Sequence, residues 1–308
     1  MKKHISCIAL FLFVLSCEFL FAQEAVFESR VDLVRIGISV EDEDGSPVTD
    51  LRREDFRVFE NDEPQVVRYF SNNIAADITT IPFHLGLLFD TSGSMEREGR
   101  FAKTAAIKFF NTVTYAEDIT LVDFDSEVRV GRYSQADFPR LVERIRRSQS
   151  NGDTALYDAL GVYLDGAFSQ DGRKVLLLYT DGADTRSRTK FSEALDLIRA
   201  SDVTIYAIGF QKYLRSSQRT LQRMRLEQLV DLTGGRSYFP NDIDDLEEIY
   251  ERISDELDAR YSLGYESNNS ATDGTWRDVT VKIVGSRREL ERLRVKSRKG
   301  YYAPFIEP

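Results

Sequence analysis

An apolar run meets a short polar loop in the stretch Phe83-His84-Leu85-Gly86-Leu87-Leu88-Phe89-Asp90-Thr91-Ser92-Gly93-Ser94-Met95. The apolar run is typical of a buried strand. The loop after it carries one carboxylate and two hydroxyls at alternate positions, Asp90, Ser92 and Ser94. Hard oxygen ligands at this spacing suit Mg²⁺, which takes roughly six oxygens at about 2.0–2.1 Å and keeps some of them as water. A turn that caps a helix has the same residues, so the loop alone is weak grounds for a metal site.

Two later segments carry further oxygen ligands. Gly152-Asp153-Thr154-Ala155-Leu156 places a threonine just before a predicted helix. The run Val175-Leu176-Leu177-Leu178-Tyr179-Thr180-Asp181-Gly182 ends a second apolar strand on an aspartate. Both aspartates therefore follow predicted buried strands, and the threonine lies between them in the sequence.

These three segments, in this order, resemble the metal-ion-dependent adhesion site of the von Willebrand factor A domain. The family pattern is Asp-x-Ser-x-Ser, then a distant Thr, then a distant Asp followed by Gly. Every member has a match here: Asp90, Ser92, Ser94, Thr154 and Asp181. The resemblance implies one bound ion, Mg²⁺ or alternatively Mn²⁺ or Ca²⁺, which the serines and the threonine coordinate directly. It also implies that the aspartates bind the ion directly or through water.

From Phe83 onward, apolar strands alternate with amphipathic helices. The helices are predicted over residues 101–113, 138–147, 156–168, 191–200, 226–232 and 243–257. This alternation predicts an α/β fold, with a doubly wound, mainly parallel sheet covered on both faces. The resemblance places a von Willebrand factor A domain over residues 80–260. In such sheets ligands bind beyond the carboxyl ends of the strands, where both Asp90 and Asp181 are expected.

The flanking regions, residues 23–76 and 261–308, have the patterns of β-strands. Apolar and polar residues alternate from Val34 to Glu41, and a hairpin of residues 56–59 and 66–70 is predicted around 61–64. Neither flank alone has enough strands for a stable sandwich. We therefore expect the two flanks to pair in a second, all-β sandwich-like domain, with the A domain inserted between them.

Short motifs in both flanks resemble a bacterial, exported subset of A-domain proteins found in acidobacteria and relatives. The motifs are Pro47-Val48-Thr49-Asp50-Leu51, Asp55-Phe56-Arg57-Val58-Phe59-Glu60, Tyr261-Ser262-Leu263-Gly264-Tyr265 and Arg298-Lys299-Gly300-Tyr301-Tyr302. They are less specific than the metal-site pattern and say little about function.

The first 22 residues are predicted to be a signal peptide, because Lys2 and Lys3 precede an apolar stretch. Cleavage after Ala22 gives a secreted or periplasmic protein. Alternatively, residues 14–17 loosely resemble a bacterial lipobox, and a lipidated Cys17 would anchor the chain to a membrane. An uncleaved membrane anchor is less favoured because Glu18 interrupts the apolar run.

Composition excludes several classes of enzyme site. Both cysteines, Cys7 and Cys17, lie in the predicted leader, so the mature chain has no disulfide, zinc–thiolate site or cysteine nucleophile. Of the two histidines, His4 also lies there, and His84 lies inside a predicted strand, which makes a Ser-His-Asp hydrolase improbable. The formal net charge of −10 disfavours nucleic acid as a partner.

Three functions remain open. The first is a non-enzymatic binding module, in which the ion accepts an Asp or Glu carboxylate from a protein partner. Neutral hydroxyl ligands favour this function, because they leave the ion electrophilic. The second is metal-assisted hydrolysis, with the same ion activating water. The third is a metal-free structural scaffold whose loop only caps a helix. We favour the binding module.

Overall fold

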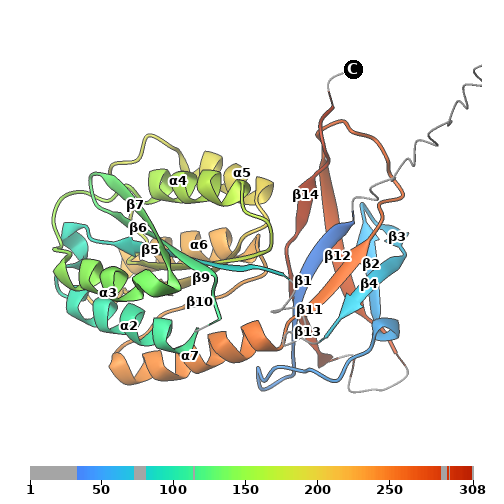
Figure 1. Ribbon diagram of the computed structural model, residues 1–308, viewed down its shortest axis with the longest axis horizontal. Coiled ribbons are helices and arrows are strands. Elements are labelled where there is room, and N and C mark those ends of the chain that lie inside the picture. The colour runs from blue at the N-terminus through green and yellow to red at the C-terminus, as the bar shows by residue number, and fades with distance from the viewer. Residues whose placement is uncertain (1–32, 73–80, 114, 286–289, 291, 307–308) are drawn as a thin grey trace, which may run out of the picture. The chain divides into compact units, whose positions relative to one another are not determined.

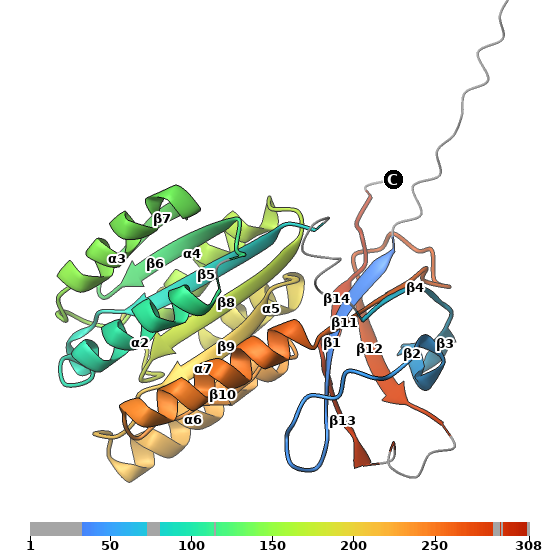
Figure 2. The same cartoon turned by 60° about the horizontal axis from the view of Figure 1, so that its bottom comes forward.

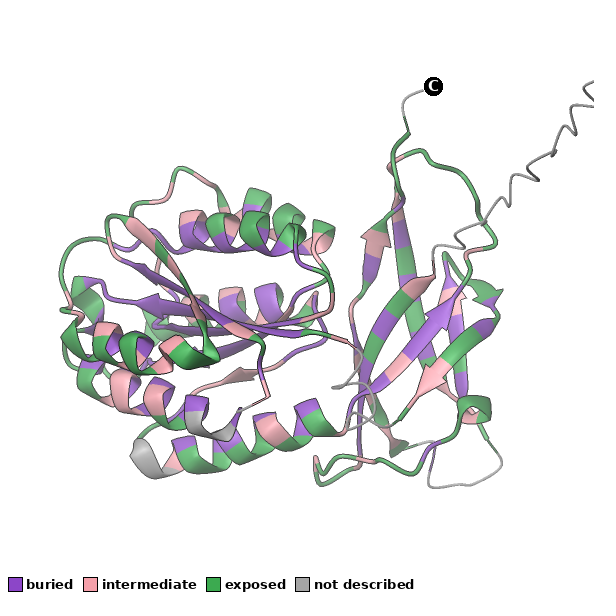
Figure 3. Ribbon diagram, viewed as in Figure 1, coloured by how far each residue is buried: buried purple, intermediate pink, exposed green. Residues whose placement is uncertain are grey.

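The computed structural model describes residues 33–72, 81–113, 115–285, 290 and 292–306, and helices flank a six-stranded, mostly parallel sheet in it (Figure 1). Its strands are β5 (Phe83–Asp90), β6 (Asp118–Phe124), β7 (Val128–Ser134), β8 (Arg173–Thr180), β9 (Thr204–Gly209) and β10 (Ser237–Tyr238). The order is β10-β9-β8-β5-β6-β7, and only β7 is antiparallel to its neighbour. All eight residues of β5 are buried, as expected for a central parallel strand (Figure 3).

Helices cover both faces of this sheet (Figure 2). One face packs against α2 (Gly99–Thr112), α3 (Phe138–Arg147) and α7 (Ile243–Asp258). The other packs against α4 (Leu156–Phe168), α5 (Phe191–Ala200) and α6 (Ser216–Asp231). Each face of the sheet has its own apolar core, and successive side chains of β5 point to opposite faces. Leu87 therefore packs in the core beneath α2, α3 and α7, and Leu88 packs in the core beneath α4, α5 and α6. The predicted α/β, doubly wound fold is confirmed.

Helix α6 is longer than its sequence pattern suggests. It begins at Ser216, whereas the apolar pattern begins only at Leu226. Its buried residues are Leu226, Leu229 and Val230, all in the second half. The spacing of apolar residues identifies only the part of a helix that packs against the core. The first half of α6 is exposed, so the apolar pattern does not predict it.

The flanking regions form two four-stranded antiparallel sheets with a shared apolar core. Their strands are β1 (Val34–Glu41), β2 (Phe56–Glu60), β3 (Glu63–Gln65), β4 (Val67–Ser71), β11 (Tyr261–Tyr265), β12 (Trp276–Ile283), β13 (Arg294–Ser297) and β14 (Gly300–Tyr302). The orders are β13-β1-β11-β4 and β14-β12-β2-β3. Each sheet combines strands from both flanks, as in the pairs Ile38↔Tyr261 and Val58↔Val281. Short 3₁₀ helices lie at Arg53–Asp55, Gly93–Met95 and Gln135–Asp137.

The predicted hairpin of the N-terminal flank is wrong in its second strand. Strand β2 turns at Asn61 and Asp62, whose φ angles are 48° and 67°, and returns at once as β3. Asn and Asp tolerate positive φ, which makes a two-residue turn possible. Pro64 is acceptable in β3 because β3 is an edge strand. The chain then changes sheets, and β4 pairs with β11.

Helix α7 leads almost directly into the sandwich, since β11 begins at Tyr261. Near this junction, Ser39 Oγ on β1 donates to Glu256 Oε1 on α7 at 2.9 Å. Arg236 lies between two buried acids, in an ion pair with Glu41 of β1 and 3.8 Å from Glu256. The residues predicted as a leader lie outside the described part of the chain. No described helix is long and apolar enough to cross a membrane.

Close packing between β5 and α4 yields a stability test. A Cβ added at Gly86 would lie 2.3 Å from the ring of Tyr163, which is 2% exposed, whereas one added at Gly166 on the exposed side of α4 meets nothing within 4 Å. We expect Gly86→Ala to lower the free energy of unfolding by about 1–3 kcal/mol through overpacking. Gly166→Ala, the matched control, should leave it unchanged or raise it by up to about 1 kcal/mol. Urea denaturation measures both, and equal effects would contradict the described packing.

Candidate metal centre

The loops that carry the predicted ligands meet at the carboxyl ends of β5 and β8. Asp90 is the last residue of β5, and Asp181 directly follows β8. The loop after β5 is tied to the loop before α4 by two backbone hydrogen bonds, from Gly93 N to Gly152 O (2.9 Å) and from Asn151 N to Thr91 O (2.8 Å). These bonds fix the serine loop beside the segment that ends in the threonine.

The carboxylate of Asp90 is buried and accepts hydrogen bonds on both oxygens. Ser92 N donates to Oδ1 at 2.9 Å, and Thr180 Oγ1 donates to Oδ2 at 2.6 Å. Burial, followed by the negative charge of Asp181, raises the pKa of Asp90 to about 7. Two buried carboxylates at one sheet edge therefore repel each other.

The hydroxyl groups lie beside this carboxylate. Ser92 Oγ and Ser94 Oγ are 3.0 Å apart, and Ser92 is fully buried whereas Ser94 is exposed. Thr154 is 3% exposed, and Thr185 holds its backbone through a bond from Thr154 N to Thr185 Oγ1 at 3.0 Å. Asp181 Oδ1 accepts from Ala183 N at 2.8 Å, which orders its own loop.

Glu98 is a further acid that the sequence pattern did not identify. It directly precedes α2 and is 6% exposed, and its Oε1 has no hydrogen-bond partner among the described residues. Burial, followed by the charge of Asp181, raises its pKa to about 7, while the backbone amides of Lys212 and Tyr213 act in the opposite direction. Its burial depends on the loop after β9, so spacing relative to Asp90 could not have revealed it.

These features fit a divalent cation. A positive charge would relieve the repulsion between Asp90 and Asp181 and would compensate the orphaned oxygen of Glu98. Within the described ranges, no three acidic, histidine or cysteine side chains converge as a metal cluster. An ion bound here would therefore need the neutral oxygens of Ser92, Ser94 and Thr154 besides carboxylates.

Other acids near this edge have structural partners. Arg129 Nε donates to Asp123 at 2.7 Å, and its Nη2 donates to Asp125 at 2.9 Å. Asp184 Oδ2 accepts from Tyr157 N at 3.1 Å, which satisfies an amide in the first turn of α4. The side chain of Asp153 is exposed. Asp123, Asp125 and Asp184 therefore have partners within the protein, and Asp153 faces solvent.

His84 lies at the opposite end of β5 from Asp90. Its Nδ1 is 3.2 Å from Asp118 Oδ1, and its Nε2 is 3.0 Å from the carbonyl oxygen of Asp171. Six residues of extended strand span roughly 20 Å. The imidazole therefore cannot act as a base on Ser94, and His84 is a packed, hydrogen-bonded histidine.

Known proteins match the central part of the chain. The family model described as von Willebrand factor type A domain matches residues 84–252. No curated protein matches the chain. Among solved structures, von Willebrand factor type A from Catenulispora acidiphila is 14% identical with a TM-score of 0.48, covering 91% of this chain and 76% of that chain.

Two similar structures come from pilus proteins. PilB minor pilin from Streptococcus sanguinis is 12% identical with a TM-score of 0.47, and the match covers 58% of this chain and only 62% of the pilin chain. The vWF domain of the type V pili tip protein Mfa5 from Porphyromonas gingivalis is 13% identical with a TM-score of 0.45, covering 63% of this chain and 99% of that chain. The family model itself spans more than half of the sequence, and the chain therefore belongs to the von Willebrand factor type A domain family.

Proposed function

We propose that this chain is an exported, non-enzymatic binding module that holds a carboxylate of a protein partner through one divalent cation. The ligands are Asp90, Ser92, Ser94, Thr154 and Asp181. The observation that carries the proposal is the pair of serine hydroxyls, 3.0 Å apart, beside a buried carboxylate whose neighbour is a second buried acid. Membership of the von Willebrand factor type A family supports it.

The charges of the ligands decide what the ion can do. Among the five proposed ligands, Asp90 and Asp181 carry negative charge, and the three hydroxyl ligands carry none. An ion held in this way remains electrophilic and attracts an Asp or Glu side chain of a partner. Mg²⁺ is our first choice, with Mn²⁺ or Ca²⁺ as alternatives.

Hydrolysis is the weaker alternative. A pKa near 7, as for Asp90 and Glu98, is typical of acid–base catalysts. Both carboxyls are buried, however, at 1% and 6% exposure, and both acids lie beside Asp181 where a cation would compensate them. The metal-free scaffold does not explain why Glu98 Oε1 is buried without a partner.

Export and the bacterial subset stay predictions. The proposed signal peptide and the alternative lipid anchor at Cys17 lie outside the described residues. The proposed partner is a protein, since the net charge of −10 disfavours nucleic acid.

Metal binding should stabilise the protein. At a hundredfold excess over its dissociation constant, Mg²⁺ should add about 2.7 kcal/mol to the free energy of unfolding. We expect a saturable rise in Tm in a Mg²⁺ titration after EDTA treatment, and its loss in a Ser92→Ala/Ser94→Ala variant. Ser46→Ala/Thr272→Ala, which removes two hydroxyl residues from exposed turns of the sandwich, is the control and should respond like the wild type. An unchanged Mg²⁺ response in the Ser92/Ser94 variant would overturn the site.

Carboxylate binding should depend on the metal. Short peptides that contain Asp or Glu should bind in Mg²⁺ but not in EDTA, and their Asn or Gln counterparts should bind in neither. Isothermal titration calorimetry measures this difference. Binding of the Asp peptide in EDTA would contradict capture through the ion, even if the Mg²⁺ site itself exists.

The metal-free protein should lose stability as pH rises. Asp90 and Glu98 have pKa values of about 7 in the folded protein, above the ordinary values of 3.8 and 4.5 for these side chains. Between about pH 4 and pH 7 the folded state therefore binds more protons than the unfolded state, and the free energy of unfolding falls as pH rises. We expect Tm in EDTA to fall by several degrees from pH 5 to 8, less steeply with saturating Mg²⁺ or in Asp90→Asn. The same slope in Asp90→Asn and wild type would show that other groups cause it.

A further inference from the structure

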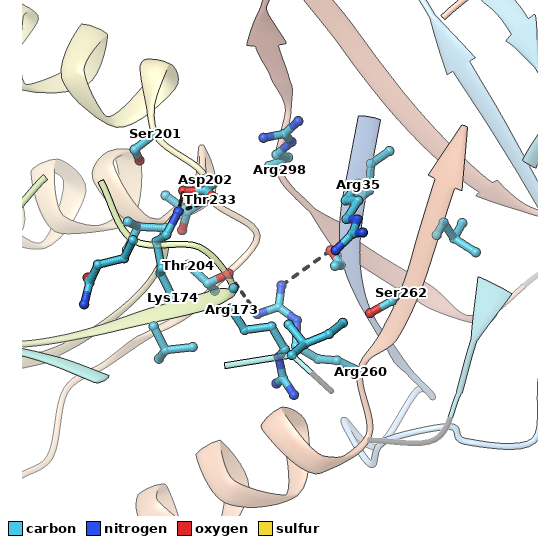
Figure 4. Close-up of a pocket in the computed structure, with 18 of the residues that line it drawn as sticks. Arg35, Arg173, Lys174, Ser201, Asp202, Thr204, Thr233, Arg260, Ser262 and Arg298 are labelled. Atoms are coloured by element: carbon cyan, nitrogen blue, oxygen red, sulfur yellow. Dashed lines mark hydrogen bonds and ion pairs between the residues drawn. The ribbon is translucent and has the colours of Figure 1, made fainter. Parts of the chain in front are cut away.

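A basic cavity lies at the amino ends of the central strands, whereas the candidate metal centre lies at their carboxyl ends. Its volume is about 260 Å³, and its lining includes the first residues of β8 and β9 together with residues of β1 and β11 (Figure 4). Arg173 begins β8, whereas Asp181 follows its end, and eight residues of strand span roughly 25 Å. The cavity is therefore separate from the metal-binding loops.

Positive charge gathers around this cavity although the whole chain is acidic, with a net charge of −10. Two acids, Asp171 and Asp202, are also part of the lining. The basic side chains in the lining outnumber them: Arg35, Arg173, Lys174, Arg199, Arg260 and Arg298. In Figure 4, Lys174 and Arg173 reach the region from the central sheet, while Arg35 reaches it from β1 and Arg298 from the segment between β13 and β14.

The partners in the structure compensate only part of this charge. Lys174 Nζ lies 2.8 Å from both carboxylate oxygens of Asp202. Arg260 has only neutral partners, since it donates to Thr204 Oγ1 at 3.0 Å and to Gly37 O at 3.4 Å. Arg298 lies 5.4 Å from the centre of the Tyr301 ring, and no ion pair joins it to a described residue.

Two of these guanidinium groups also have unused donors. Arg260 is 7% exposed, and the Nε atoms of Arg260 and Arg298 are both buried without a hydrogen-bond partner among the described residues. Burying a polar donor without a partner is costly, and burying an arginine without a counter-charge is more so. Burial lowers the pKa of Arg298, although the negative charge of Asp202 acts in the opposite direction. An anion in the cavity would remove both costs.

We propose that this cavity binds a small phosphate group, either as the free anion or carried on a small ester. Guanidinium groups match phosphate oxygens through charge-assisted hydrogen bonds. Arg35, Arg260 and Arg298 come from three different segments, so a tetrahedral group with several oxygens serves them better than one planar carboxylate. The volume is slightly below the usual range for sites of drug-sized ligands, which favours a small ligand.

The test measures binding of sodium phosphate to the full chain by calorimetry and by Tm, in EDTA and against sodium chloride at matched ionic strength. We expect a saturable rise in Tm with phosphate alone. Arg298→Gln and Arg35→Gln should each weaken binding roughly tenfold, the effect of one lost charge-assisted contact. Arg146→Gln removes an exposed charge of α3 outside the cavity and should bind like the wild type.

Two outcomes would overturn the proposal. One is the absence of a phosphate effect beyond that of chloride, and the other is wild-type binding in both Arg298→Gln and Arg35→Gln. Because the Nε atom of Arg298 is buried, Arg298→Gln could fail to fold, which circular dichroism would reveal, and Arg35→Gln at an exposed position then decides. Binding of glycerol phosphate distinguishes a phosphate ester from the free phosphate anion as the ligand. Tighter binding than inorganic phosphate assigns the site to an ester, and equal or weaker binding assigns it to the free anion.

Discussion

The hydrogen bond from Thr180 to Asp90 is the contact on which the candidate metal centre depends. It joins the carboxyl ends of two neighbouring buried strands, at 2.6 Å, and thereby fixes where the loops after them begin. The buried strand β5 delivers a carboxylate into a place where water cannot solvate it, and such a group is tolerated only with donors around it. Thr180 and the amide of Ser92 are those donors. Asp181, the next residue after Thr180, then adds a second negative charge that the hydrogen bonds do not neutralise.

The two proposed ligands therefore suit opposite edges of one sheet. At the carboxyl ends, carboxylates and hydroxyls gather and favour a cation. At the amino ends, Arg173 and Lys174 join arginines of the sandwich and favour an anion. The sandwich thus contributes to the cavity as well as to the stability of the chain. It is also tied to α7, since Glu256 accepts a hydrogen bond from Ser39 of β1.

Much of this arrangement was predictable because the signals are local. A run such as 83–89 specifies a buried strand by composition alone, and Asp90 follows from its position at the end of that run. Glu98 was not predictable, because a loop more than a hundred residues away buries it. The predicted hairpin paired residues 56–59 with residues 66–70, because an apolar pattern begins at Val66. In the structure β2 pairs with β3, and the chain then crosses to the other sheet, where β4 pairs with β11. The basic cavity was out of reach for the same reason as Glu98, since it combines residues as distant as Arg35 and Arg298.

The insertion of the A domain between the two halves of the sandwich also separates paired strands widely in the sequence. Strand β1 pairs with β11, and the partners Ile38 and Tyr261 are separated by about 220 residues. Closing a loop of this length in an unfolded chain is entropically costly, whereas a folded A domain holds its own ends in place and shortens the effective loop. The βα units of the A domain are more local and can form first. At synthesis rates of about 5–20 residues per second, β1 waits on the order of 10–45 s for its partner strand. During this time the hydrogen-bonding edges of β1 are unpaired, and an unpaired strand edge is a template for aggregation.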